Sequence, residues 1–522
     1  MKIWRDTVPS SSLSSSRNSN RGDCSDCDDC DDCSVREKED NWSNYDERAT
    51  NHQSGSSNYL SANDNIGIFR SKSLLHAAPI HIQPCSDDRW LVCNPVGSGE
   101  IAVLDAEAFS VFQRFGSPTT PGHVLETSRG VSATSLENAV TLLYNTGLLR
   151  DAERTIDVRE EQKPQTLQAW LHVTNACNLS CHYCYISKSS ERMADNTSRR
   201  AVDAIFRSAL RQRFKRVRVK YAGGEASLYL PRILALHTYA SQLAEQHGIE
   251  FSAYIITNGV ALPRRAIEAL RANKIAVTIS LDGVGDAHDQ QRVFANGLGS
   301  FKYVDRTIAR LLANGVVPHI NVTVTQRNLD GLPSLMAYIL ERDMPFTLSY
   351  YRENACSLHL GDLQFTDEQM IGGMREAFHI IEEMLPRRRL LGSLIDKADL
   401  RNPHNHTCSA GRSYLVIDQH GGIAKCHTEI QHTLTSVDAD DPLRIIQEDR
   451  SSFQNLPVEE KEGCKTCMWR YWCTGGCPLV TYQMTGRNDI RSPNCHIYQA
   501  LFPDALRLEA LRLLKYELPI VL

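Results

Sequence analysis

Between residues 167 and 355, short apolar runs alternate with longer stretches in which apolar residues recur every three or four positions. The runs are typical of strands and the stretches of amphipathic helices. Because strand and helix alternate, the strands are expected to be parallel. The expected strands are residues 169–175, 216–224, 251–259, 275–283, 319–325 and 346–351. The pattern predicts an α/β fold, a partial (β/α)6 TIM-type barrel with its chemistry at the carboxyl ends of the strands.

Residues 74–155 are expected to form a small winged-helix-like domain. Short alternating apolar runs come first, and helix-like segments follow from about residue 106. The last segment has a capping-box pattern at Thr134 and Glu137, and Gly147 stands where the helix should end. The charged residues 156–166 are expected to link this domain to the barrel.

The remaining segments differ in composition. Residues 1–73 are rich in Ser, Asn and Asp and poor in aliphatic residues, so we expect a disordered tail without a core of its own. Residues 356–400 are expected to be a helical bridge, and residues 401–500 a loop-rich domain that contains seven cysteines. The pattern of residues 501–522 predicts a terminal helix.

The composition excludes several classes of protein. Of the 522 residues, 42% are hydrophobic and 23% charged, which is typical of globular proteins. No apolar run has the length of a membrane span, and the first residues lack the pattern of a secretory signal. The net charge of −5 does not resemble that of a nucleic-acid binder. We therefore expect a cytoplasmic protein with no nucleic-acid or membrane partner.

Cysteine is the unusual component, with 17 residues, most of them in tight groups. In a reducing compartment, grouped cysteines favour metals or clusters over disulfides. Directly after the first expected strand, Cys177, Cys181 and Cys184 form a CxxxCxxC loop. Three thiolates can hold three irons of a [4Fe–4S] cube and leave the fourth iron open. A zinc loop with a distant fourth ligand, or cysteines that only pack, are the alternatives.

This loop, together with Gly223, Gly224 and Glu225 after the second strand, resembles the motifs of the radical S-adenosylmethionine (radical SAM) superfamily over residues 167–355. The resemblance implies that the cysteines carry a catalytic [4Fe–4S] cluster whose free iron binds S-adenosylmethionine (SAM). It also implies that an electron from a donor such as flavodoxin or ferredoxin cleaves SAM to a 5′-deoxyadenosyl radical.

The resemblance further assigns residues to SAM itself. Tyr183 matches an aromatic position near the adenine. Gly223 and Gly224 let SAM approach the backbone, and Glu225 meets the SAM ammonium. Ala226 departs from the family, which usually has Pro there.

Polar residues at later strand ends are further candidates. Ser280 and Asp282 match positions that hydrogen-bond the ribose, and Arg292 matches a residue that pairs with the SAM carboxylate. An SxDG sequence alone is also typical of a turn. Other polar residues at strand ends are found in binding sites and in ordinary barrels alike: Thr257, Asn258, Asn321 and Thr323.

Seven further cysteines lie between residues 401 and 500. Their spacing resembles the SPASM extension of radical SAM enzymes, which binds two auxiliary iron–sulfur clusters. The resemblance assigns one [4Fe–4S] cluster to Cys464, Cys467, Cys473 and Cys495. It assigns the other cluster to Cys408, Cys426 and Cys477. A zinc ribbon is the competing interpretation of residues 464–477.

The second auxiliary set is one ligand short. Its fourth iron is expected either to bind a substrate atom or to take another protein ligand. Nearby residues that could supply this ligand, and that could equally be surface or packing residues, are His404, His406, His427 and Cys356.

His427 has a second candidate role. In the SPASM enzymes that oxidise cysteine or serine in sulfatases, an aspartate at this position is thought to take the substrate proton. A neutral imidazole can accept a proton, so His427 is a candidate catalytic base. The departure disfavours sulfatase maturation.

The small domain resembles, in topology, the peptide-recognition domain of many peptide-modifying radical SAM enzymes. Such a domain binds a leader peptide as an added strand at the edge of its sheet. A generic winged-helix extension is the alternative. Cys85 and Cys93 within it are expected to be buried small hydrophobic residues.

The tail contains Cys24, Cys27, Cys30 and Cys33 at a regular step of three among aspartates. A cluster loop, a loosely bound soft metal and no role at all are open interpretations. A fourth is a substrate or its mimic, because two of these cysteines have the Cys-x3-Asp spacing of peptides in which sulfur is joined to aspartate. If so, the intact mass after turnover falls by two hydrogens for each bond. No such loss within residues 20–40 would contradict this hypothesis.

Together these features predict a radical SAM/SPASM enzyme that cross-links or oxidises a ribosomally synthesised peptide. Its partner would be a precursor peptide or protein. The alternatives are a maturase that activates a partner protein, of the sulfatase or quinoprotein type, and a non-catalytic zinc- or peptide-binding scaffold.

Overall fold

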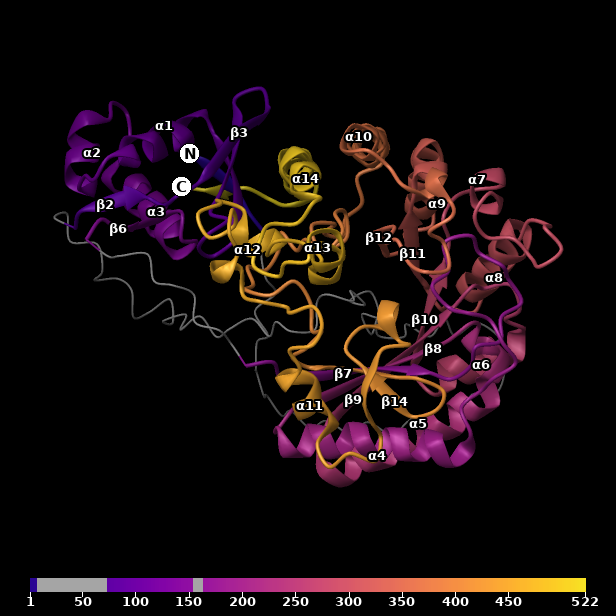
Figure 1. Ribbon diagram of the computed structural model, residues 1–522. Coiled ribbons are helices and arrows are strands. Elements are labelled where there is room, and N and C mark those ends of the chain that lie inside the picture. Colours follow the sequence, from indigo (N-terminus) through magenta and orange to yellow (C-terminus); the bar gives the residue numbers. More distant parts are fainter. Residues whose placement is uncertain (7–72, 154–162) are drawn as a thin grey trace, which may run out of the picture.

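A computed structural model describes residues 1–6, 73–153 and 163–522 (Figure 1). The cysteine repeat between Cys24 and Cys33 lies outside the described residues. Within them, the largest sheet has nine strands in the order β12-β11-β10-β9-β8-β7-β13-β14-β15. This sheet and its helices position the site.

The six predicted barrel strands are confirmed, and neighbouring strands pair in parallel. They are β7 (Thr166–His172), β8 (Arg216–Ala222), β9 (Glu250–Thr257), β10 (Ile275–Ser280), β11 (His319–Val324) and β12 (Phe346–Tyr350). The connecting helices are α4 (Asp195–Arg211), α5 (Leu230–His247), α6 (Arg264–Ala272), α7 (Asp286–Asp289), α8 (Phe301–Ala313) and α9 (Leu332–Glu341). The helices lie on the outer side of the curved sheet (Figure 1).

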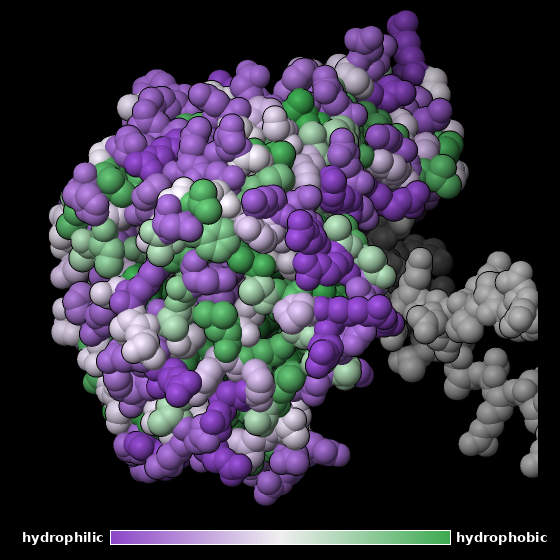
Figure 2. Space-filling view, turned by 90° about the vertical axis from the view of Figure 1, so that its right-hand side faces the viewer, coloured by the Kyte–Doolittle hydropathy of each residue, from purple (hydrophilic) through white to green (hydrophobic). Residues whose placement is uncertain are grey.

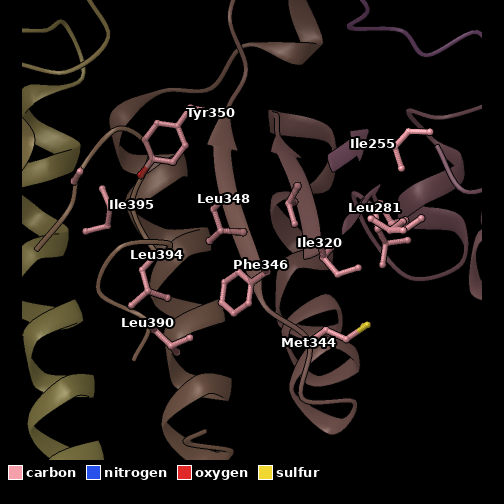
Figure 3. Close-up of a cluster of buried hydrophobic side chains, with 14 of the residues drawn as sticks. Ile255, Leu281, Ile320, Met344, Phe346, Leu348, Tyr350, Leu390, Leu394 and Ile395 are labelled. Carbon is pink, nitrogen blue, oxygen red and sulfur yellow. The ribbon is translucent and has the colours of Figure 1, made fainter. Parts of the chain in front are cut away.

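The β12 edge of the barrel sheet is covered by the segment that follows α10 (Asp367–Glu383), in which the Ser393 carbonyl accepts from the Leu348 amide at 3.1 Å. Figure 3 shows Phe346 and Leu348 of β12 facing Leu390 and Leu394 of this segment. All four side chains are buried. Burial of a side chain of this size contributes roughly 1.5–3 kcal/mol, so this contact fixes β12 at the margin of the sheet.

The cysteine-rich region, which the sequence predicted to be loop-rich, also extends the barrel sheet. β13 (Tyr414–Ile417) pairs in parallel with β7, and β14 (Gly422–Ala424) and β15 (Thr433–Ser436) follow antiparallel. All four residues of β13 are buried. Because β7 is buried along its whole length, β13 covers an edge that would otherwise be unpaired.

Four helices complete the C-terminal region: α11 (Pro442–Glu448), α12 (Arg470–Cys473), α13 (Pro478–Thr485) and α14 (Cys495–Tyr516). The sequence predicted that the terminal helix begins at residue 501. It begins earlier, at Cys495, which therefore lies in its first turn. α14 packs against α10 and also against the small domain.

The small domain contains β3 (His81–Ser86), β4 (Arg89–Cys93), β5 (Ile101–Asp105), α1 (Ala106–Gln113), α2 (Pro121–Thr127) and α3 (Ala133–Asn145). β2 (Leu75–Ala77) and β6 (Leu149–Asp151) pair beside it. The side chain of Ser132 caps α3 by accepting from the Ser135 amide at 3.0 Å, so the predicted cap at Thr134 is wrong by two residues. Gly147 has φ +70°, as a helix stop requires.

The first residues differ from the predicted tail. β1 (Lys2–Trp4) pairs with β5 on one side and with the C-terminal β16 (Ile520–Val521) on the other. The N- and C-termini therefore lie side by side in the small domain (Figure 1). Ile3 is only 1% exposed, so these few residues belong to a core that a tail cannot have.

Figure 2 shows hydrophobic residues interspersed with hydrophilic ones on the side of the molecule that lies to the right in Figure 1. In residues 1–6, 73–153 and 163–522, no helix combines the length and the hydropathy needed to cross a bilayer.

Candidate active site

One cavity of about 350 Å³ opens at the carboxyl ends of the barrel strands and extends to the C-terminal cysteines. Most of the predicted site residues line it. From the barrel these are Cys177, Cys181, Tyr183, Cys184, Gly223, Gly224, Glu225, Ser280 and Arg292. From the C-terminal region they are Cys408, Cys426, His427 and Cys477.

The cysteine loop follows β7 and is held by backbone hydrogen bonds to the segment after α7. Ser180 donates to the Val293 carbonyl at 2.6 Å, and His182 donates to the Gln291 carbonyl at 3.0 Å. Burial raises the pKa of Cys177 to about 11 and also raises that of Cys184. Binding of a metal cluster here is therefore coupled to release of the thiol protons.

The two glycines after β8 allow their loop to pack directly on the start of the cysteine loop. A Cβ atom at Gly223 would lie 2.4 Å from the Thr174 carbonyl, and one at Gly224 would lie 2.5 Å from the Ala176 carbonyl. The Gly224 amide donates to the Thr174 carbonyl at 2.7 Å. Only glycine fits, so these residues fix the distance between the cysteines and Glu225.

We expect Gly224→Ala to displace the cysteine loop and to impair cluster assembly, because the new methyl group meets backbone atoms that cannot move aside. After anaerobic reconstitution, the iron content per chain should fall by the amount that one [4Fe–4S] cluster holds, about four irons. Gly361→Ala is the matched control, because no atom lies within 4 Å of its Cβ position. Equal iron in the two variants would contradict this account.

Glu225 is almost fully buried at the cavity wall, and three donors hold its carboxylate. The Thr257 hydroxyl donates to Oε1 at 2.6 Å, and the Asn258 amide donates to Oε2 at 2.6 Å. The Ser227 amide donates to Oε1 at 2.9 Å. The carboxylate is therefore fixed in position and faces the cavity, where a ligand ammonium would find it.

Thr257 and Asn258 connect this carboxylate with the cysteine loop. The Asn258 side chain donates to Asn178 Oδ1 at 2.7 Å and approaches Cys177 Sγ at 3.9 Å. The sequence left both residues between a binding role and an ordinary structural one. In the sequence, these two residues were recognisable only as a polar pair at the end of a strand. That both of them donate to Glu225 is known only from the fold.

Asp282 lies behind the cavity wall, fully buried. The Tyr183 hydroxyl donates to it at 2.6 Å, Arg292 donates at 3.5 Å, and the Thr323 amide donates at 2.8 Å. Burial raises the pKa of Asp282, although Arg292 opposes this shift. Burial also raises the pKa of Tyr183, which keeps its hydroxyl protonated. In this arrangement Asp282 orients Tyr183 and Arg292, and those two residues line the cavity.

A second, small cavity lies at the N-terminal end of α14. All four cysteines predicted for one auxiliary cluster line it: Cys464, Cys467, Cys473 and Cys495. The rings of Trp469, Tyr498 and Phe502 form its apolar wall. Burial raises the pKa of Cys473 to about 12. The donors and the dry surroundings fit a buried iron–sulfur cluster.

The other three C-terminal cysteines face the main cavity beside two cationic residues. Arg352 donates to Cys477 Sγ at 3.5 Å and pairs with Asp396 at 2.7 Å. Burial alone would raise the pKa of Cys477, but Arg352 and Lys397 bring it below the usual range. Burial raises that of Cys426 to about 11. The site therefore stabilises negative charge on one of its three sulfurs.

The candidate fourth ligands separate into two groups. His404, His406 and His427 line the main cavity, whereas the exposed Cys356 does not. His427 stacks on Trp170 with ring centroids 4.6 Å apart. Within the described part of the chain, no three His, Cys, Asp or Glu side chains are placed closely enough to hold a single metal ion.

Sequence reasoning missed four of the cationic residues that line the cavity: Lys188, Lys220, Arg352 and Lys397. Lys220 is buried in β8, and its ammonium lies 5.3 Å from the Tyr254 ring centroid. In the sequence of β8, Lys220 follows Arg216 and Arg218 at alternate positions, so the pattern did not distinguish it. Arg352 and Lys397 belong to no recognisable motif.

The fold and the cysteine loop define the class of protein. Residues 171–333 match the family model of the Radical SAM superfamily. The chain is a radical SAM enzyme related to maturases. Enzymes of this class use a [4Fe–4S] cluster and SAM.

Individual relatives support this placement. Mycofactocin maturase MftC of Mycobacterium tuberculosis is 27% identical over 334 residues, which are 62% of this chain and 81% of that protein. The subtilosin biosynthesis protein AlbA of Bacillus subtilis is 26% identical over 273 residues, which are 50% of this chain and 55% of AlbA. This chain thus spans just over half of AlbA.

Among solved structures, native anSMEcpe with bound AdoMet and Cp18Cys peptide is similar in fold. Its TM-score is 0.54 at 19% identity, and the match covers 66% of this chain and 99% of that one. The likeness extends the shared fold beyond residues 171–333.

Proposed function

We propose that this enzyme cross-links or oxidises a ribosomally synthesised peptide in the cavity between the barrel and the C-terminal cysteines. One observation carries the proposal: a single cavity is lined both by the cysteine loop of the barrel and by Cys408, Cys426 and Cys477. A substrate in this cavity would contact both sites. The relation to maturases such as MftC and AlbA supports a peptide as the substrate.

On the barrel side, Cys177, Cys181 and Cys184 would hold the catalytic cluster and leave one iron for SAM. Together, the bound cluster and SAM supply the radical chemistry that removes a hydrogen atom from the substrate. The fixed carboxylate of Glu225 would accept hydrogen bonds from the SAM ammonium. Arg292, oriented by Asp282, would pair with the SAM carboxylate.

On the C-terminal side, the two sets of cysteines would hold auxiliary clusters. The enclosed set at α14 is shielded from solvent by aromatic rings and is suited to electron transfer. The set with three cysteines faces the substrate cavity, where an open iron could bind a substrate atom. Arg352 and Lys397 would offset the negative charge of these sulfurs.

His427 would take the proton that the substrate loses. Its ring is held against Trp170 in the cavity wall, and Tyr414 Oη lies 3.4 Å from Nδ1. We expect His427→Ala to lower the rate of peptide modification roughly 10²–10⁴-fold, the usual contribution of a general base. SAM cleavage should continue. A parallel loss of both activities would contradict the assignment of His427 as base.

Co-expression tests the proposed function. Each short reading frame that neighbours the gene is expressed with the wild-type enzyme or with Cys181→Ala, and the peptide is weighed by mass spectrometry. We expect one peptide to lose hydrogens in pairs, and only with the wild-type enzyme. The absence of any mass change, although the enzyme cleaves SAM, would contradict peptide modification.

A further inference from the structure

The small domain has a sheet whose two sides differ in their capacity to accept a peptide. On the β3 side, Pro84 has no amide hydrogen, and the pairing register shifts between Pro84 and Ser86. The Gln83 side chain is also tied to the Pro503 carbonyl of α14 at 3.0 Å. Proline and a bulge prevent continuous pairing, so this edge is unsuited to an added strand.

On the other side, the sheet continues beyond β5 with β1, which is itself paired with the C-terminal β16. Ile3 pairs with Leu104 and Trp4 with Val103, although 66 residues that the structure does not describe separate Asp6 from the rest of the domain. The pairing is antiparallel and short. Backbone pairing to an edge strand is the way in which many domains bind extended peptides.

Side chains recognise this strand on both of its faces. Met1 and Ile3 enter the apolar core formed with Leu104 and Phe112 of the small domain. Trp4 points to the opposite face, where the Arg89 guanidinium lies 5.0 Å from its ring centroid. Alternate pockets of this kind give a strand-binding site its specificity.

Charged groups fix both ends of the strand. The Met1 ammonium pairs with Glu107 at 2.8 Å, and Asp6 pairs with Arg512 of α14 at 2.6 Å. The segment is therefore recognised as a bound peptide is, through its backbone, its apolar side chains and its ends.

We propose that the side of β5 that pairs with β1 is the peptide-binding edge of the small domain and that residues 1–6 occupy it as an intramolecular competitor. The competing ligand is an extended peptide with apolar side chains two residues apart and an aromatic residue next. This proposal rests on the proposed function, because the ligand of this edge would be the peptide that the enzyme modifies. Because the tethered strand has a high effective concentration, it weakens binding of any peptide in trans.

The test uses the reconstituted full-length enzyme and a synthetic peptide, MKIWRD, with a free amino terminus and a fluorophore at its carboxyl end. In the double variant Ile3→Glu/Trp4→Glu, two buried carboxylates should displace the tethered strand. We expect fluorescence polarisation to show saturable binding to this variant, at least about tenfold tighter than to the wild type. Lys2→Glu is the matched control, since Lys2 is exposed and should leave binding at the wild-type level.

Asp6→Asn provides a milder second variant. It removes the pairing of the tethered strand with Arg512, whereas the added peptide keeps its own aspartate. We expect an intermediate gain in affinity, and weaker binding for an N-acetylated peptide, which cannot pair with Glu107. Equal binding to the wild type and to all variants, or no binding to any of them, would overturn the proposal. SAM cleavage by the same preparations shows separately whether the proposed function stands.

Discussion

Replacing Cys181 by Ala is expected to abolish the formation of 5′-deoxyadenosine from SAM by the reduced enzyme. Only two thiolates of the loop, those of Cys177 and Cys184, would remain to hold the catalytic cluster, whereas three irons need a protein ligand. The product is measured by liquid chromatography after anaerobic reconstitution and reduction with dithionite. The C-terminal cysteines are untouched, so iron should fall only in part.

Cys356→Ala is the matched control for this experiment. Cys356 is exposed and does not line the main cavity, so its loss should leave the rate at the wild-type level. If Cys181→Ala kept its SAM cleavage, the loop would not carry the catalytic cluster.

Glu225→Gln is expected to weaken SAM binding by roughly 10- to 100-fold, because a hydrogen bond to a charged group contributes about 1.5–3 kcal/mol. The amide loses the negative charge that would meet the SAM ammonium. Its new amide group would also face one of the three donors that now hold the carboxylate, which are the Thr257 hydroxyl and the Asn258 and Ser227 amides. The measured quantity is the KM for SAM in 5′-deoxyadenosine formation.

Glu268→Gln serves as control for the change of charge. Glu268 lies on the exposed surface of α6 and pairs with Arg264 of the same helix at 2.8 Å. Its KM should equal that of the wild type. An unchanged KM in Glu225→Gln as well would remove Glu225 from the SAM site.

The barrel was predictable because its strands are short runs of mostly buried residues and its helices have one apolar face. Both properties leave a pattern in the sequence. β13 was missed because its four residues stand among cysteines and loops, and its partner β7 is more than 240 residues away. β1 was missed because three residues give no periodicity.

The same distinction holds for the candidate site. The cysteine loop and the Gly223–Glu225 turn are contiguous and could be identified by spacing. The donors that hold Glu225 and the cations beside Cys477 come from separate segments that only the fold brings together. Asp282 matched a motif, but its position behind Tyr183 depends on packing that a motif does not encode.

The central claim, that SAM and a peptide react in one shared cavity, is tested most directly by isotope transfer. The peptide identified by co-expression is prepared with deuterium at the carbon that loses hydrogen and is incubated with the reduced enzyme and SAM. The account predicts that deuterium appears in 5′-deoxyadenosine at the rate at which the peptide is modified. Consumption of SAM without deuterium in 5′-deoxyadenosine, while the peptide keeps its label, would contradict it.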